Sequence, residues 1–75
     1  MKLSELKLGD KCKVVSIDND NSLLKRRLLD MGITRDVEIA INKVAPLGDP
    51  IDIKLRGYEL CLRKKDLSTI EVVKL

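Results

Sequence analysis

Alternation of apolar and polar positions, the pattern that predicts β-strands, dominates the second half of the chain. Apolar residues occupy every other position over residues 37–42, 51–56 and 58–63, as in strands with one face on a core. Another strand is predicted over residues 11–17, where apolar residues on both faces indicate a bulge or cover on both sides. A last strand is predicted over residues 69–73.

Turn residues separate these strands. Arg56 and Gly57 join two alternating segments and predict a tight hairpin, in which Gly57 supplies a positive φ. Residues 45–50 (APLGDP) predict a loop stiffened by its two prolines. Nothing indicates a parallel crossover. The pattern therefore predicts a mostly β protein, a small antiparallel β-barrel with one short inserted helix.

That helix has a spacing of its own. Leu24, Leu28 and Met31 recur at intervals of four and three, which places them on one helix face. Leu23 and Leu29 are expected to widen this apolar face toward the core.

The helix is predicted over about residues 22–31. Ser22 or Asn21 can cap its N-terminus, because short polar side chains accept hydrogen bonds from the first free N–H groups. Gly32 lies where a glycine commonly ends a helix, so we expect it to be structural.

Two shorter turns complete the predicted elements. Residues 3–6 are expected to form one helical turn, with Leu3, Leu6 and Leu8 directed to the core. Residues 66–67 are expected to form a turn before the last strand.

Composition limits what this fold can hold. The 75 residues predict one domain over residues 1–75, and a domain of this size buries only about 60% of the surface that its unfolded chain exposes. The chain has no Phe or Trp and a single Tyr. Leu, Ile and Val must therefore fill the core.

Charge is mildly basic, with 15 basic and 12 acidic residues and a net charge of +3. Lys25, Arg26 and Arg27 form one basic cluster and residues 63–65 a second. Binders of single-stranded nucleic acid usually add aromatic stacking platforms, and Tyr58 is the sole aromatic residue. No nucleic-acid partner is expected. The clusters predict a solvated face, or a surface that steers the chain toward an acidic or membrane-associated protein.

Residues typical of catalysis are scarce. The chain has no His, which is the commonest general base, and its isolated glycines form no phosphate-binding motif. Cys12 and Cys61 are not paired in a C-x-x-C motif and, without an export signal, indicate reduced thiols in the cytoplasm. We therefore expect a binding module and no enzyme.

A resident metal is not expected either. The segment DNDNS begins like a calcium loop, but Leu23 and Leu29 stand where its glycine and its glutamate belong. We expect no required cofactor, and the sequence predicts no metal site. Weak binding of a metal ion at the surface, through Asp18, Asp20 or Asp49, stays open.

The loop at residues 45–50 is the most suggestive segment. Leu47 lies between Pro46 and Gly48, in a segment whose other residues favour exposure. The prolines reduce the ordering entropy that binding would cost. Leu47 is either a contact for a partner or a plug that folds back over the barrel.

Three blocks of sequence resemble the FeoA family, ferrous iron transport protein A, in their order and spacing. They are residues 27–33 (RLLDMGI), 45–51 (APLGDPI) and 56–63 (RGYELCLR). One departure is that Arg35 and Asp36 stand in a turn where the family commonly has a glycine. Since Asp tolerates turns, the fold should be unaffected.

The resemblance implies an SH3-like barrel and a cytoplasmic role in bacterial ferrous iron uptake. The implied partner is ferrous iron transport protein B, a membrane transporter with a cytoplasmic GTP-binding domain, through which the chain would be peripheral to the membrane. It also implies kinship with the SH3-like domain of some iron- and manganese-dependent repressors.

These observations predict an accessory or regulatory module with a partner-binding surface from the loop, the hairpin and the basic helix face. Leu47 and Arg27 are the expected contacts, and Gly57, like Gly32, is expected to be structural. The predicted surface consists of Lys25, Arg26, Arg27, Pro46, Leu47, Gly48, Asp49, Arg56 and Tyr58. The alternative function is a metal-responsive regulatory module that binds Fe²⁺ weakly or acts with a transcription regulator.

Overall fold

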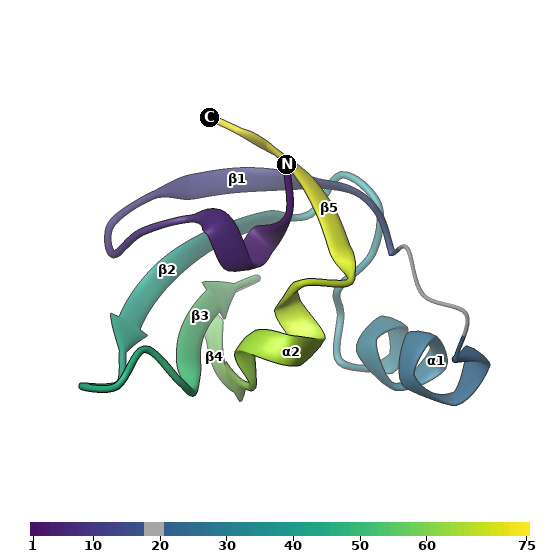
Figure 1. Cartoon of the computed structure of the whole chain (residues 1–75). Coiled ribbons are helices and arrows are strands. Elements are labelled where there is room, and N and C mark those ends of the chain that lie inside the picture. The colour runs from purple at the N-terminus through teal and green to yellow at the C-terminus, as the bar shows by residue number, and fades with distance from the viewer. Residues whose placement is uncertain (18–20) are drawn as a thin grey trace.

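A curved antiparallel sheet forms the centre of the computed structural model, which describes residues 1–17 and 21–75 (Figure 1). The strand order is β4-β3-β2-β1-β5, so only the β1–β5 neighbours are not consecutive in the chain. This arrangement confirms the predicted mostly β, antiparallel architecture. The strands are β1 (Lys11–Ile17), β2 (Glu38–Val44), β3 (Ile51–Leu55), β4 (Tyr58–Leu62) and β5 (Ile70–Lys74).

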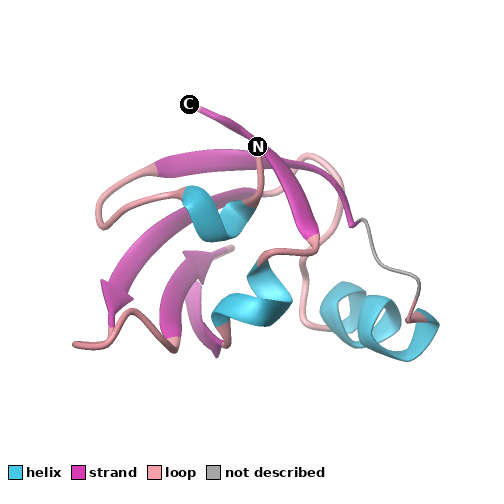
Figure 2. Cartoon of the chain, in the orientation of Figure 1, coloured by secondary structure: helices cyan, strands magenta, loops and turns pink. Residues whose placement is uncertain are grey.

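Three short helical segments accompany the sheet (Figure 2). They are the 3₁₀ turn η1 (Leu3–Glu5), α1 (Ser22–Asp30) and α2 (Lys64–Leu67). The turns η1 and α2 contact each other within the curve of the sheet, whereas α1 lies beside it (Figure 1). The helical turn predicted near the N-terminus is confirmed. At residues 66–67 the predicted turn is a four-residue helix instead.

Aliphatic side chains from all five strands fill the space between the sheet and η1 and α2, as the composition predicts. The core also takes in side chains from the helical segments and from the loop after α1. Its fully buried residues are Leu3, Val14, Leu28, Ile33, Ile39, Ile53, Leu55, Leu67, Ile70 and Val72, together with Cys12. The expectation that Leu8 joins this core is wrong, because its side chain is 64% exposed. Leu8 lies in the turn that Gly9 and Asp10 close before β1, and the turn directs it outward.

Both ends of α1 follow from local sequence. Asn21 is the N-cap, and its side-chain oxygen accepts hydrogen bonds from the N–H groups of Leu23 and Leu24 at 3.1 and 3.2 Å. At the other end, Gly32 N–H donates to the Leu29 carbonyl and Ile33 N–H to the Leu28 carbonyl, each at 3.0 Å. This is the Schellman arrangement, in which the glycine needs a positive φ, here +96°.

The apolar face of α1 is narrower than predicted. Leu28 is its one buried residue, and Leu24 and Met31 pack partly against the core. Leu23 is 74% exposed and Leu29 is also exposed, so the prediction that they widen the core-facing side is wrong. Because α1 lies beside the sheet, only one line of side chains, at spacings of four and three, reaches the core.

The predicted bulge in β1 is confirmed by a register shift against β5 between Val14 and Ser16. The turn before β2 holds Asp36 at a φ of +71°. Asp is among the few residues other than glycine that adopt this region readily. Asp36 therefore makes the turn in which the family commonly has a glycine. Asp18 and Asp20 of the calcium-like segment lie outside the described residues, whereas Asn21 of the same segment is the N-cap of α1.

Candidate functional site

The loop between β2 and β3 is a tight turn with a leucine at its tip. Gly48 N–H donates to the Ala45 carbonyl at 2.7 Å, and Ala45 N–H donates to the Pro50 carbonyl at 3.1 Å. Pro46 and Leu47 are the central residues of that turn, with Pro46 at the position where a fixed φ favours it. Gly48 follows with a φ of +87°. The backbone bonds thus hold Leu47 at the end of a closed loop.

Leu47 is 96% exposed. The plug hypothesis is therefore wrong, because a plug would be buried against the barrel. The hydrogen bond between Gly48 and Ala45 closes the turn and leaves Leu47 at its outer end. This apolar side chain is available to a partner.

Asp49 from the same loop is already engaged. Its Oδ1 accepts a hydrogen bond from Lys64 N–H at 2.8 Å, at the first residue of α2. The carboxylate satisfies a free N–H at a helix start. Asp49 therefore fixes the loop against α2.

The β3–β4 hairpin holds the C-terminal end of α1. Tyr58 O–H donates to the Met31 carbonyl, and Arg56 Nη2 donates to Thr34 Oγ1 at 2.8 Å. A side chain at Gly32 would collide with the Tyr58 hydroxyl. Two of the three sequence blocks thus meet in space, and Arg56 and Tyr58 are occupied in joining them.

The hairpin turn itself uses positive φ at both central residues. Gly57 has a φ of +85° and Arg56 a φ of +50°, the combination that the tight two-residue hairpin requires. The sequence indicated this requirement for Gly57 only.

The three basic residues of α1 do not form one face. Lys25 lies toward β1, beside Leu29 and Arg35. Arg27 lies on another side of the helix, which faces a groove that Lys65 also lines. Successive helix residues point about 100° apart, so three in a row cannot share a face. Arg26 is exposed and lies with neither of these two groups of residues.

A groove of about 860 Å³ lies between α1, the end of β4 and α2. Leu23, Leu24 and Leu62 contribute apolar walls, and Arg27, Arg63 and Lys65 contribute cations. One residue of the first basic cluster, Arg27, therefore lines the same groove as two of the second, Arg63 and Lys65. Sequence reasoning named Arg27 but missed the others, and the basic cluster at residues 63–65 was the one signal for them.

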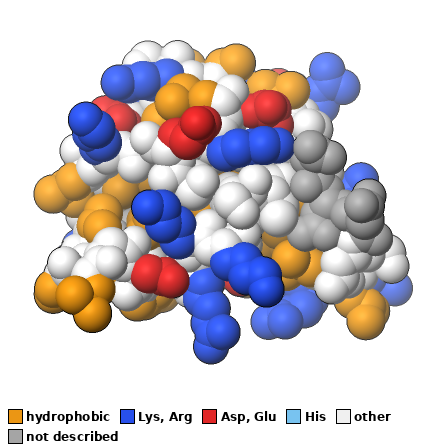
Figure 3. Space-filling view, viewed as in Figure 1, with side chains coloured by type: hydrophobic (Ala, Val, Ile, Leu, Met, Phe, Trp, Pro, Cys, Tyr) orange, Lys and Arg blue, Asp and Glu red, His pale blue; other side chains and the backbone are white. Residues whose placement is uncertain are grey.

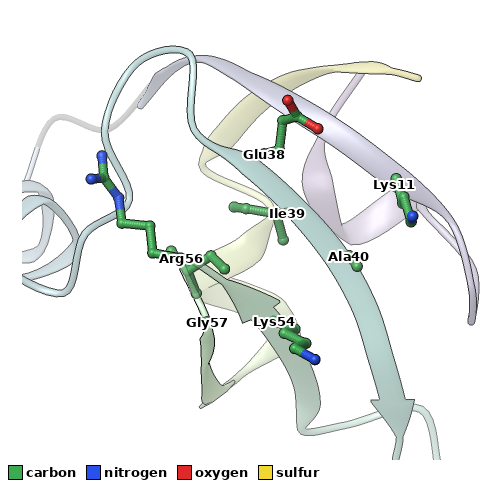
Figure 4. Close-up of a pocket in the computed structure, with 8 residues that line it drawn as sticks. Lys11, Glu38, Ile39, Ala40, Lys54, Arg56 and Gly57 are labelled. Atoms are coloured by element: carbon green, nitrogen blue, oxygen red, sulfur yellow. The ribbon is translucent and has the colours of Figure 1, made fainter.

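A smaller hollow of about 200 Å³ lies on the outer face of the sheet (Figure 4). Ala40 pairs in register with Lys11 on one side and Lys54 on the other. The small side chain between two lysines leaves the depression. None of the predicted partner-binding residues except Arg56 lies at it.

The two thiols differ in environment. Burial raises the pKa of the Cys12 thiol to about 11, with a smaller opposing effect from a hydrogen bond to Ile39. Cys61 is exposed and lines the groove. Over residues 1–17 and 21–75, no three metal-binding side chains (His, Cys, Asp or Glu) come together to hold an ion. No helix in that part of the chain is long and apolar enough to cross a membrane.

The model of the FeoA domain matches residues 1–74. An Fe(2+) transport protein A/Fe(2+) transporter FeoB fusion protein from Porphyromonas gingivalis is 35% identical over 72 residues, which are 96% of this chain and 8% of that protein. The chain thus spans a small part of the length of this relative.

Solved structures agree with the family match. A FeoA-like protein from Clostridium acetobutylicum has a TM-score of 0.91 and 44% identity, over 100% of this chain and 86% of that one. FeoA from Stenotrophomonas maltophilia, complexed with zinc and described as a prokaryotic SH3 domain protein, has a TM-score of 0.86 and 26% identity, over 97% of this chain and 89% of that one. These likenesses confirm the SH3-like fold.

Proposed function

The chain belongs to the FeoA family, the FeoA domain of ferrous iron transport, and on that premise we propose that it is an accessory binding module for the transporter. The proposed partner is the membrane protein FeoB, and the proposed location is the cytoplasm, at the membrane through that partner. In this role the chain binds and regulates. GTP hydrolysis and passage of the ferrous ion belong to the partner.

The exposure of Leu47 is the observation that carries this proposal. An apolar side chain held in water at the tip of a closed turn gains free energy when a partner buries it. The turn is fixed by its own backbone bonds and by the Asp49 contact with α2. Little ordering entropy is then lost on binding.

The Porphyromonas gingivalis relative supports the choice of partner. Its name assigns transport protein A and the FeoB transporter to one chain. Fusion keeps two domains at a high effective concentration, and two proteins that associate as separate chains gain from such a link. The same association is proposed for this chain and a separate FeoB.

Replacement of Leu47 tests the proposal. Leu47→Asp should weaken binding to the purified cytoplasmic domain of FeoB from the same organism roughly ten- to a hundredfold, because burying a leucine contributes about 1.5–3 kcal/mol. The unfolding temperature should barely change, because Leu47 is almost fully exposed. Isothermal titration calorimetry and thermal unfolding measure the two effects.

Leu8→Asp is the matched control. Leu8 is also an exposed leucine in a turn, and it also precedes a glycine of positive φ with open space around it. The Leu8→Asp substitution should leave binding to the FeoB domain unchanged. Equal weakening by both substitutions, or no binding by the unaltered chain, would contradict the proposal.

A further inference from the structure

The groove between α1 and α2 has apolar walls that nothing in the described chain covers completely. Leu62 is buried and Leu24 half-buried at its base, while Leu23 stands exposed beside them. Covering such apolar surface with another apolar group removes it from water, which is favourable. The walls therefore favour an occupant with aliphatic side chains.

Cations rim the same groove from two directions. Arg27 comes from α1, whereas Arg63 and Lys65 come from the start of α2, with Asp66 as the acidic residue among them. Among the residues that the structure describes, none of these three cations forms an ion pair. Basic side chains also gather along the lower edge of the molecule in Figure 3, where α1 and α2 lie in Figure 1. The rim therefore favours negative charge.

We propose that this groove binds a short acidic segment of a protein partner, with leucine-like side chains against the walls and carboxylates against the rim. This inference deepens the proposed function, on which it rests only for the identity of the partner. It adds a second contact to the Leu47 loop, with electrostatic attraction that the loop lacks. Charge complementarity of this kind mainly sets specificity and association rate.

The shape of the groove argues for a segment of chain. A hollow of about 860 Å³ is as large as pockets that bury a small ligand, so it has room for a few side chains of a peptide. A bilayer surface is flat and offers no side chains to insert. A second copy of this chain is a weaker occupant, since two molecules of net charge +3 repel each other.

The test uses a defined probe and the whole chain. The probe is a peptide of about 14 residues with leucines at helical spacings of three and four and glutamates elsewhere, the arrangement that helix-in-groove binding requires. Its partner peptide has lysine for every glutamate. Backbone amide NMR shifts of the chain are followed as each peptide is added. Shifts at residues 23–27 and 61–65, for the acidic peptide only, are expected.

Charge reversal then tests whether the acidic peptide binds through the cations of the groove. Arg27→Glu/Lys65→Glu should weaken binding of the acidic peptide by about tenfold or more at low salt. Lys7→Glu/Lys11→Glu makes the same change in net charge at exposed positions outside the groove. It should weaken binding by much less.

Several results would overturn the inference. They are the absence of localised shifts at about 1 mM acidic peptide, equal binding of the lysine peptide, and equal effects of the two charge reversals. Binding to phosphatidylglycerol vesicles through these residues, without binding of the peptide, would assign the groove to a lipid surface. Self-association lost with Arg27→Glu/Lys65→Glu, again without peptide binding, would assign it to a second copy.

The outcomes separate this inference from the proposed function. If the FeoB cytoplasmic domain binds the unaltered chain and the Arg27→Glu/Lys65→Glu variant equally, FeoB remains the partner and the proposed role of the groove is wrong. If the acidic peptide binds in the groove and the FeoB domain does not bind, the proposed role of the groove is kept and FeoB is the wrong partner.

Discussion

Gly32 and Tyr58 show how single residues join distant segments of this fold. The glycine ends α1 with a φ of +96°, and the missing side chain leaves room for the Tyr58 hydroxyl to reach the Met31 carbonyl. A positive φ explains why a glycine stands there, but not why nothing larger could fit. That second reason lies in a residue 26 positions later.

Gly32→Ala should therefore lower the free energy of unfolding in two ways. The backbone conformation costs about 1–3 kcal/mol for a residue other than glycine, and the collision displaces Tyr58 as well. Gly48→Ala is the matched control, because Gly48 has a φ of +87° with open space around it. Urea unfolding should show a clearly larger loss for Gly32→Ala, part of which Tyr58→Phe restores in the double variant. Equal losses at both glycines would show that the Tyr58 contact does not matter.

Cys12 gives the stability of the chain a dependence on alkaline pH. Burial raises the pKa of its thiol from 9.0 to about 11, so the unfolded chain releases this proton at lower pH than the folded one. The stabilisation is complete below about pH 9 and is lost as pH rises toward about 11. We expect this group to lower the free energy of unfolding by about 2 kcal/mol over that window.

Cys12→Ala isolates that contribution. Urea unfolding of both chains at pH 8 to 11, in steps of about one unit, should give a stability difference that shrinks as pH rises. A difference independent of pH would mean that Cys12 does not titrate as its burial implies.

At the level of elements, the strands could be predicted from the sequence almost completely. All five were predicted to within two residues of their observed bounds. Alternation indicated β2, β3 and β4, because one face of each packs on a core and the other faces water. The caps of α1 were predictable for a similar reason, since they depend on neighbouring residues. The helix α2 was not, because the Asp49 carboxylate that caps its first turn comes from another loop.

The helix α1 is the element most weakly joined to the rest. Leu28 is its one buried residue, and the Tyr58 bond holds its C-terminal end. Tyr58→Phe removes a hydrogen bond worth about 1 kcal/mol. Amide hydrogen exchange in α1 should become several-fold faster, while exchange in β2 and β3 changes little. A uniform change across the sheet would contradict this view of α1 as a separately opening unit.

At the level of the whole molecule, the candidate surface could be predicted only in parts. The sequence identified the Leu47 loop and both basic clusters, but it could not decide whether Leu47 was a plug. It also could not show that residues 21–27 and 61–66 face each other across a groove. Such a surface depends on how distant elements pack. The sequence pattern, in contrast, reports on neighbours.

The central proposal is that the chain binds FeoB through the Leu47 loop and the groove. The most direct measurement is an amide NMR titration of the labelled chain with the purified cytoplasmic domain of FeoB. We predict shifts and line broadening at residues 45–49, 23–27 and 61–65, with residues 11, 40 and 54 around the outer hollow (Figure 4) unaffected. No change on addition of the domain, or changes centred on that outer hollow, would contradict the account.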